Sequence, residues 1–284
     1  MKSIPAHEVR ALVRSALAED IGPGDATTLA TVPARATAIA HMVAREPLVV
    51  AGLDCAVECF RALSPAVELK RHVSDGERAN AGARLLTVRG RTRAILTAER
   101  VALNFVQRLS GIATLTAQFV EAVRGTGAAI LDTRKTTPGL RRLEKHAVKC
   151  GGGRNHRLGL HDRVLIKDNH LAALRDAKPN AIAAAVARAR AKWPGMVIEV
   201  EADTLAQVRQ AVAANPHIIL LDNMTLAQLR AAVRFVAGRA RTEASGGANL
   251  RTVRAIAQTG VDFISVGALT HSARAVDLAL DFES

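Results

Sequence analysis

The sequence predicts an α/β protein whose C-terminal part is a parallel β-sheet covered by helices. After Gly111, short apolar runs alternate with segments of helical periodicity, and the runs are apolar at successive positions rather than at every second one. Continuous apolar strands are typical of a parallel sheet that is buried on both faces. The clearest runs are 128–131, 164–166, 196–200, 218–221 and 263–266.

Helices are expected between these strands, and polar residues follow the strand ends. The helical segments are 140–150, 181–192, 205–214, 226–236 and 250–258. The polar clusters at the strand ends are 132–135, 167–170, 199–203, 222–225, 244–247 and 267–271. In a β/α barrel the carboxyl ends of all strands meet at one mouth. The six clusters would then share one pocket, which favours an enzyme.

The N-terminal part has a different pattern. A helix is expected at 7–18, followed by a turn-rich segment at 20–28 whose Gly-Pro-Gly ends any helix. Strand-like runs at 37–43 and 84–88 are separated by a turn at 74–76. The clearest amphipathic helix of the chain is 92–109, because its apolar residues recur at intervals of three and four.

Composition limits the classes of protein that fit. The chain has 284 residues, 49% of them hydrophobic, which suits one or two globular domains. No secretory signal or membrane-spanning run is recognisable, so we expect a cytoplasmic protein without a membrane partner. The three cysteines, Cys55, Cys59 and Cys150, are too few for a disulfide framework, and we interpret them as small buried side chains.

The formal net charge of +13 permits nucleic-acid binding, but the sequence favours a smaller partner. Single-strand binders stack bases on aromatic rings, and this chain has six Phe, one Trp and no Tyr. The segment 132–170 holds ten Lys/Arg and four His against four acidic residues, together with a run of three glycines. Such a segment is suited to gripping a compact polyanion.

Several residues of this segment are candidates for anion binding. Thr133, Arg134 and Lys135 follow a strand directly, and arginine and lysine bind carboxylates and phosphates; a solvated surface pair is the alternative. The glycines at 151–153 are either a phosphate cradle or a helix end, and His156 with Arg157 follows them. Lys167 ends a strand, where it is either an anion clamp or a Schiff-base nucleophile.

Acidic residues mark two neighbouring strand ends. Glu199, Glu201 and Asp203 alternate, which places them on one face of a strand, and we expect all three near the mouth because burying them would be costly. Asp222 follows the next strand. Glu201 and Asp222 are a plausible pair for Mg²⁺ or for sugar hydroxyls. Salt bridges to the lysines and arginines opposite are the alternative.

Two glycine-rich loops follow the last strands. They are Ser245-Gly246-Gly247 and Ser265-Val266-Gly267-Ala268, and each leads towards a helix. β/α barrels commonly bind a phosphate at this position through backbone N–H groups.

Read in order, these motifs resemble the quinolinate phosphoribosyltransferase family, and the combination of 132–141 with 151–157 is highly specific. Further matching motifs are 19–25, 99–104, 110–114, 199–201, 221–223, 243–247 and 265–268. The resemblance implies an N-terminal α/β sandwich (1–110, joined by about 271–284) and a C-terminal open seven-stranded α/β barrel with the active site (111–270). It also implies a homodimer in which Arg100 completes the active site of the neighbouring subunit.

The resemblance also implies a reaction: phosphoribosyl transfer from phosphoribosyl pyrophosphate to quinolinate with loss of CO₂, in NAD biosynthesis. Arg100, Arg134, His156, Arg157 and Lys167 would meet the quinolinate carboxylates, and Lys135 would face the reacting centre. Glu201 and Asp222 would hold ribose hydroxyls with Mg²⁺, and the loops at Ser245 and Ser265 the 5-phosphate. A Schiff-base aldolase using Lys135 or Lys167 and a basic nucleic-acid-binding protein are the alternatives.

Overall fold

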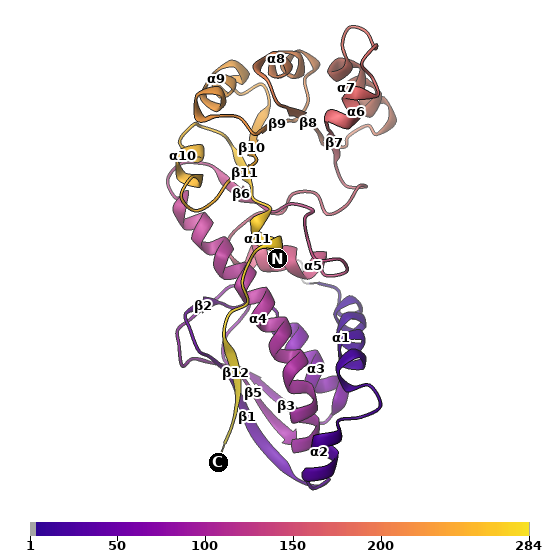
Figure 1. The fold of residues 1–284 in the computed structure, drawn as a ribbon, viewed down its shortest axis with the longest axis vertical. Helices are drawn as coiled ribbons and strands as arrows, with labels where there is room; N and C mark the ends of the chain where they lie inside the picture. The colour runs from indigo at the N-terminus through magenta and orange to yellow at the C-terminus, as the bar shows by residue number, and fades with distance from the viewer. Residues whose placement is uncertain (1–3, 284) are drawn as a thin grey trace. The chain divides into compact units, whose positions relative to one another are not determined.

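The computed structural model describes residues 4–283 and divides the chain into two compact units (Figure 1). The first unit contains the chain up to Ala117, Arg142–Gly152, and the segment from Ser272 onward. The second unit contains Gln118–Arg141 and Gly153–His271. No helix among the described residues is long and apolar enough to cross a membrane.

The first unit is built on a four-stranded antiparallel sheet. Its strand order is β12 (Leu278–Phe282), β1 (Thr37–Ala44), β5 (Arg84–Arg91) and β3 (Glu68–Arg71). A two-stranded ladder joins β2 (Leu48–Val49) to β4 (Arg78–Ala79). Its helices are α1 (Ala6–Ile21), α2 (Ala26–Thr31), α3 (Leu53–Leu63), and most of both α4 (Thr92–Ala122) and α5 (Arg141–Cys150). The last strand of the chain thus completes the first sheet.

Helix α4 carries much of the core of this unit. The predicted apolar face is buried, with Ile95, Ala98, Ala102 and Val106 at most 1% exposed. The helix continues past the predicted end at residue 109. The reason is local: the Ser110 hydroxyl bonds both the N–H and the C=O of Ala51, so a polar residue at this buried position does not interrupt the helix.

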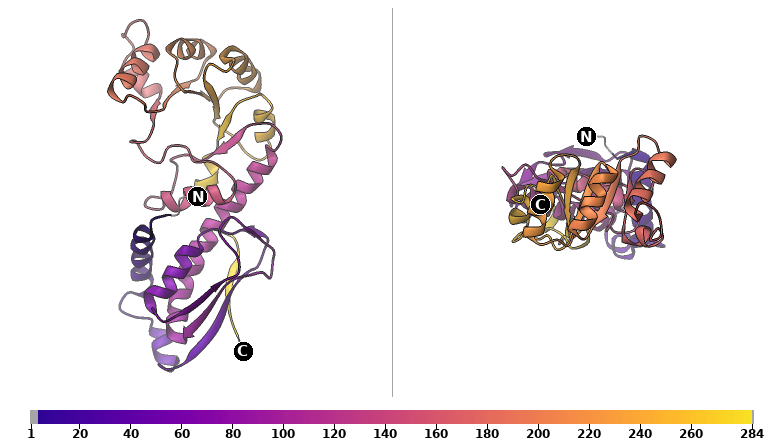
Figure 2. Two further views of the ribbon diagram at one scale, coloured as in Figure 1. Left: turned by 180° about the vertical axis from the view of Figure 1, so that it is seen from behind. Right: turned by 90° about the horizontal axis from the view of Figure 1, so that it is seen from above.

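The second unit is a six-stranded parallel sheet, which confirms the predicted α/β fold. Its order is β6 (Ala129–Leu131), β11 (Phe263–Ser265), β10 (Arg241–Ser245), β9 (Ile218–Asp222), β8 (Ile198–Ala202) and β7 (Val164–Ile166). The helices are α6 (Asp168–Ala172), α7 (Ala181–Lys192), α8 (Leu205–Ala214), α9 (Leu226–Val236), α10 (Val253–Ala257) and α11 (Ala268–His271). Figures 1 and 2 show α8, α9 and α10 along the outer side of the curved sheet.

The seventh barrel strand that the resemblance implied is reduced to one residue. Among the described residues, Arg154 makes a single parallel bridge to Leu131, through the Arg154 N–H to Ile130 and the Asp132 N–H to Arg154. The following residues turn away from the sheet because the N–H of His156 bonds the Asp132 carboxylate instead of a neighbouring strand. The barrel is therefore open beside β6.

Local sequence signals set the helix starts next to the site. Helices α8 and α9 each begin with a capping box, Thr204 with Gln207 and Thr225 with Gln228. The predicted helices at 181–192, 205–214 and 226–236 are confirmed. The strand predicted at 196–200 lies two residues later, because Met196 completes a turn with Trp193.

Gly111 allows a tight backbone contact inside the first unit. A Cβ atom at this position of α4 would lie 2.0 Å from the carbonyl oxygen of Arg274. By helix propensity alone, Gly111→Ala would stabilise the protein by about 1 kcal/mol. We expect the clash to dominate and the variant to lose about 1–3 kcal/mol, seen as a lower midpoint of thermal unfolding. Gln118→Ala, on an exposed position of α4, is the control; equal melting of both variants would contradict the close contact.

Candidate active site

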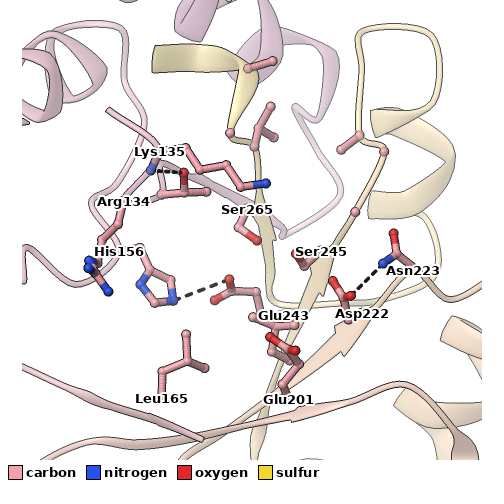
Figure 3. Close-up of a pocket in the computed structure, with 18 of the residues that line it drawn as sticks. Arg134, Lys135, His156, Leu165, Glu201, Asp222, Asn223, Glu243, Ser245 and Ser265 are labelled. Atoms are coloured by element: carbon pink, nitrogen blue, oxygen red, sulfur yellow. Dashed lines mark hydrogen bonds and ion pairs between the residues drawn. The ribbon is translucent and has the colours of Figure 1, made fainter. Parts of the chain in front are cut away.

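A pocket of about 690 Å³ lies in the second unit, at the carboxyl ends of the parallel strands. Every strand of the sheet from β7 to β11 contributes a side chain, and residues that follow β6, β7, β9, β10 and β11 close it (Figure 3). The lining includes all predicted site residues except Arg100: Thr133, Arg134, Lys135, His156, Arg157, Lys167, Glu201, Asp222, Ser245, Gly246, Gly247, Ser265, Val266, Gly267 and Ala268.

Cations occupy one side of the pocket. Arg134 and Arg157 are close enough that Arg134, after burial, lowers the pKa of the Arg157 guanidinium. The Nε atom of Arg134 is buried and makes no hydrogen bond to any residue that the structure describes. A buried donor without a partner is costly, and two like charges repel each other. An anion bound between the two guanidinium groups would relieve both costs.

The Lys135 loop is held in place from two sides. The Lys135 N–H bonds Thr133 Oγ1 at 3.0 Å, and Thr270 Oγ1, from α11, donates to the Lys135 carbonyl at 2.7 Å. The side chain itself reaches along the pocket wall, where its Cδ lies 3.2 Å from the Cβ position of Gly267. A mobile ammonium group on a fixed backbone suits a phosphate or pyrophosphate.

Three carboxylates gather at the other side of the mouth. Oxygens of Glu201, Asp203 and Asp222 all lie within 4.8 Å of one another. Lys167 Nζ lies 2.8 Å from Glu201 Oε2, and Asn223 Nδ2 donates to Asp222 Oδ2 at 2.6 Å. Oxygen-only donor sets suit Mg²⁺, so these residues fit the predicted ion. The salt bridge predicted as the alternative is present as well, between Lys167 and Glu201.

The loop after β10 requires glycine. Gly246 has a φ of +97°, and a Cβ there would lie 2.1 Å from Asn223 Oδ1. Gly247 also has a positive φ of +61°. Two glycines in this conformation bring backbone rather than side chains to the pocket, as a phosphate-binding loop requires.

The prediction for Glu199 was wrong in its depth. Glu199 is completely buried below the mouth, because Arg163 and His156 both contact its carboxylate: Arg163 Nη1 lies 3.2 Å and His156 Nε2 lies 3.0 Å from Oε2. Asp203, expected on the same face as Glu199, lies beyond the end of β8 and is exposed.

The glycine run at 151–153 ends α5 and does not line the pocket. A Cβ at Gly151 would lie 2.3 Å from the carbonyl oxygen of Ala113, so this glycine is required by packing. Of the two interpretations left open by the sequence, the helix end is correct. Arg100 lies on the exposed face of α4 in the first unit and is absent from the pocket lining of the described chain.

Sequence reasoning gave no role to six residues of the lining: Leu165, Leu220, Asn223, Glu243, Ala248 and His271. Glu243 is the most important of them, because it is a fully buried carboxyl group at the floor. The signal that could have found it is the alternation of side chains along a strand. Glu243 stands two residues before Ser245, so both point into the pocket.

The comparisons agree with this geometry. A model of the quinolinate phosphoribosyl transferase C-terminal domain matches residues 112–281, and a model of the N-terminal domain of the same enzyme matches residues 25–110. The chain belongs to the quinolinate phosphoribosyltransferase family.

Similar proteins come from distant organisms. A nicotinate-nucleotide pyrophosphorylase [carboxylating] of Mycobacterium leprae is 48% identical over 280 residues, covering 96% of each chain. A chloroplastic one of Arabidopsis thaliana is 41% identical over 298 residues, covering 99% of this chain and 85% of the relative. The solved nicotinate-nucleotide pyrophosphorylase from Francisella tularensis superimposes with a TM-score of 0.93 at 40% identity, covering 99% of this chain and 98% of that one.

The raised pKa of Glu243 predicts how the stability of the protein depends on pH. Burial, then the Glu199 carboxylate, raises the pKa of Glu243 from 4.5 to about 8. Between these values the folded protein holds a proton that the unfolded chain has lost, so rising pH destabilises the fold. Glu243→Gln removes this proton. We therefore expect its free energy of unfolding to rise relative to that of the unchanged protein from pH 5 to 8, by up to about 1.4 kcal/mol per pH unit.

Urea unfolding of both proteins at several pH values measures this difference. Above pH 8 the difference should level off, because Glu243 is then ionised in both states. A difference that stays constant across the range would contradict a raised pKa for Glu243.

Proposed function

We propose that this chain transfers the phosphoribosyl group of phosphoribosyl pyrophosphate to quinolinate with decarboxylation. The products are nicotinate mononucleotide, pyrophosphate and CO₂, and the reaction belongs to NAD biosynthesis. The observation that carries the proposal is one pocket with arginines on one side and carboxylates and glycine loops on the other. The arginines suit the carboxylates of a dicarboxylic acid. The carboxylates and glycine loops suit a sugar phosphate and its metal ion.

The first side would bind quinolinate. Arg134 and Arg157 present guanidinium groups that match carboxylates in shape and charge, and Lys167 adds an ammonium group at the rim. His156 stands below them, with its Nδ1 accepting the Arg157 N–H at 2.7 Å. This contact fixes the imidazole and the Arg157 backbone together, so His156 supports the carboxylate site from beneath.

The second side would bind phosphoribosyl pyrophosphate. Glu201 and Asp222 would hold ribose hydroxyls and, with Asp203, Mg²⁺, while the loops at Ser245–Gly247 and Ser265–Ala268 would take the 5-phosphate through backbone N–H groups. When bound, Mg²⁺ would neutralise charge that develops on the leaving pyrophosphate. Lys135 would add its ammonium group to the same leaving group.

Positioning and charge explain the catalysis. Departure of pyrophosphate leaves cationic character on the sugar, which the carboxylates near the ribose stabilise. The pyridine nitrogen then attacks the anomeric carbon. The resulting pyridinium withdraws electrons from its C2 carboxylate, so that this group leaves as CO₂.

At Lys167, the Schiff-base alternative is disfavoured by an ion pair. Glu201 Oε2 lies 2.8 Å from Lys167 Nζ, so the amine is engaged in a salt bridge and is not presented as a free nucleophile. This arrangement favours anion binding.

A direct assay tests the proposed function. Incubation with quinolinate, phosphoribosyl pyrophosphate and Mg²⁺ should give nicotinate mononucleotide and CO₂ in equal amounts, and chelation of the metal with EDTA should abolish turnover. Nicotinate in place of quinolinate, which offers one carboxylate fewer, is the control substrate. Failure to form product at high enzyme concentration would overturn the proposal.

Variants of two neighbouring cations, Lys135 and Arg134, should distinguish turnover from quinolinate binding. Lys135→Ala should lower kcat about 100-fold or more with little change in quinolinate affinity, because its charge acts on the leaving group. Arg134→Ala should weaken quinolinate binding by about 2–3 kcal/mol, because a charge-assisted hydrogen bond is lost. Calorimetric titration with quinolinate and steady-state kinetics measure the two effects, and the reverse pattern would contradict the assignment.

We further propose that two copies of the chain share their active sites. Arg100 is exposed on α4 of the first unit and does not line the pocket of the second unit; as the family resemblance implies, it would act on the quinolinate site of a second subunit. Arg100→Ala and Lys135→Ala homodimers should both be nearly inactive. Mixing the two variants and allowing subunits to exchange should restore about a quarter of full activity, because half of the dimers then contain one intact site.

Sedimentation of the mixture establishes the dimer, and unmixed variants incubated in the same way are the controls. No gain of activity on mixing would show that Arg100 acts within its own chain or not at all. The cytoplasmic location and the lack of a nucleic-acid partner stay predictions.

A further inference from the structure

Glu243 is a carboxyl group at the floor of the pocket that the proposed binding steps leave without a role. It lies on β10 between Leu220 of β9 and Phe263 of β11, is 0% exposed, and belongs to the pocket lining. Figure 3 shows its carboxyl group turned towards His156. A buried carboxyl group inside an otherwise anion-binding pocket is costly, so it calls for a functional reason.

The neighbours of Glu243 leave it protonated. The guanidinium group of Arg163 and the Nε2 atom of His156 lie closest to Glu199, at 3.2 and 3.0 Å. Within the described chain, the ion-pairing contact of Glu243 is His156 Nε2 at the longer distance of 3.7 Å. Two carboxylates that share one site rarely ionise together. Glu199 therefore takes the charge, and Glu243 retains the proton, which agrees with its raised pKa.

His156 does not compete as a source of protons towards the pocket. Its Nδ1 accepts the Arg157 N–H at 2.7 Å, so the ring proton is on Nε2. That atom points to the two glutamates rather than to the cavity. The guanidinium groups of the pocket do not release protons at neutral pH, and Lys167 is ion-paired at the rim.

The proposed reaction needs one proton at a carbon atom. When the bond between ring carbon C2 and its carboxylate breaks, the electron pair stays on C2 and CO₂ departs. The negative charge on C2, beside the pyridinium nitrogen, is removed only when a C–H bond forms. Supplying this proton from a positioned acid is general acid catalysis, and it prevents recapture of CO₂.

We propose that Glu243 is the acid that protonates C2 of the pyridine ring as CO₂ leaves. The proton passes from the Glu243 carboxyl oxygen to C2, and its electron pair remains on Glu243 as a carboxylate. Water restores the proton after the product departs. The step rests on the proposed function, and it requires the bound ring to present C2 to β10.

Two variants of one position test the proposal. Glu243→Gln keeps the volume and removes the acidic proton, and we expect its kcat to fall about 100- to 10,000-fold while quinolinate binds within about threefold of its normal affinity. Glu243→Ala leaves a cavity at the floor. Added formate should enter it as formic acid and raise the turnover of this variant about tenfold or more, while Glu243→Gln, which has no cavity, should not respond.

The outcomes separate this proposal from the proposed function. If the unchanged protein makes no nicotinate mononucleotide, the proposed function fails. If it does, the role of Glu243 is overturned by normal turnover of Glu243→Gln, by equal loss of turnover and quinolinate binding, or by a folded Glu243→Ala that formate does not rescue. If Glu243→Ala does not fold, Glu243→Asp replaces it: retention of at least a tenth of kcat supports the acid, and a kcat of Glu243→Asp as low as that of Glu243→Gln overturns it.

Discussion

The register of the parallel strands is the constraint on which the site depends. Side chains alternate along a strand, and neighbouring parallel strands are paired so that partners point to the same face. Leu165 is paired with Glu199, Glu201 with Leu220, and Leu220 with Glu243. All of these residues therefore point to one face of the sheet. A shift of one residue in any strand would turn its contribution from the pocket into the helical layer.

This register places three glutamates on one face of the sheet, Glu201 and Glu243 in one row and Glu199 in the next, and the environment of each decides its charge. Glu201 and Glu243 are both level with Leu220, on either side of it. Glu201 meets the ammonium group of Lys167, whereas Glu243 faces the already ionised Glu199. Two chemically identical side chains in one row thus differ in charge: Glu201 pairs with an ammonium group, and Glu243 is a neutral acid. Separation of protonation states by local environment is how one site combines acid and base chemistry.

The sequence was sufficient for the fold and for most of the site because both follow from local patterns. Apolar runs located the strands, and the residues after each run lie at one mouth whatever the details of packing. Glu199 was misjudged because its compensation comes from Arg163 and His156, which are distant in the chain. The reduced seventh strand likewise depends on one long-range bond, from the His156 N–H to Asp132. The periodicity of residues within one segment of the sequence does not show contacts between residues that are distant in the chain.

The buried carboxyl group of Glu243 points to a function, because packing at this position does not require a carboxyl group. Its neighbours on the adjacent strands, Leu220 and Phe263, are apolar, so an uncharged side chain of similar size would satisfy the same space at lower cost. Protein sequences depart from such local preferences mainly where function demands it. The cost at Glu243 increases with pH, because ionisation next to Glu199 is resisted by burial and by repulsion alike. Glu243 thus destabilises the fold at high pH, where it would lose its proton. We infer that the residue is kept because the reaction uses that proton.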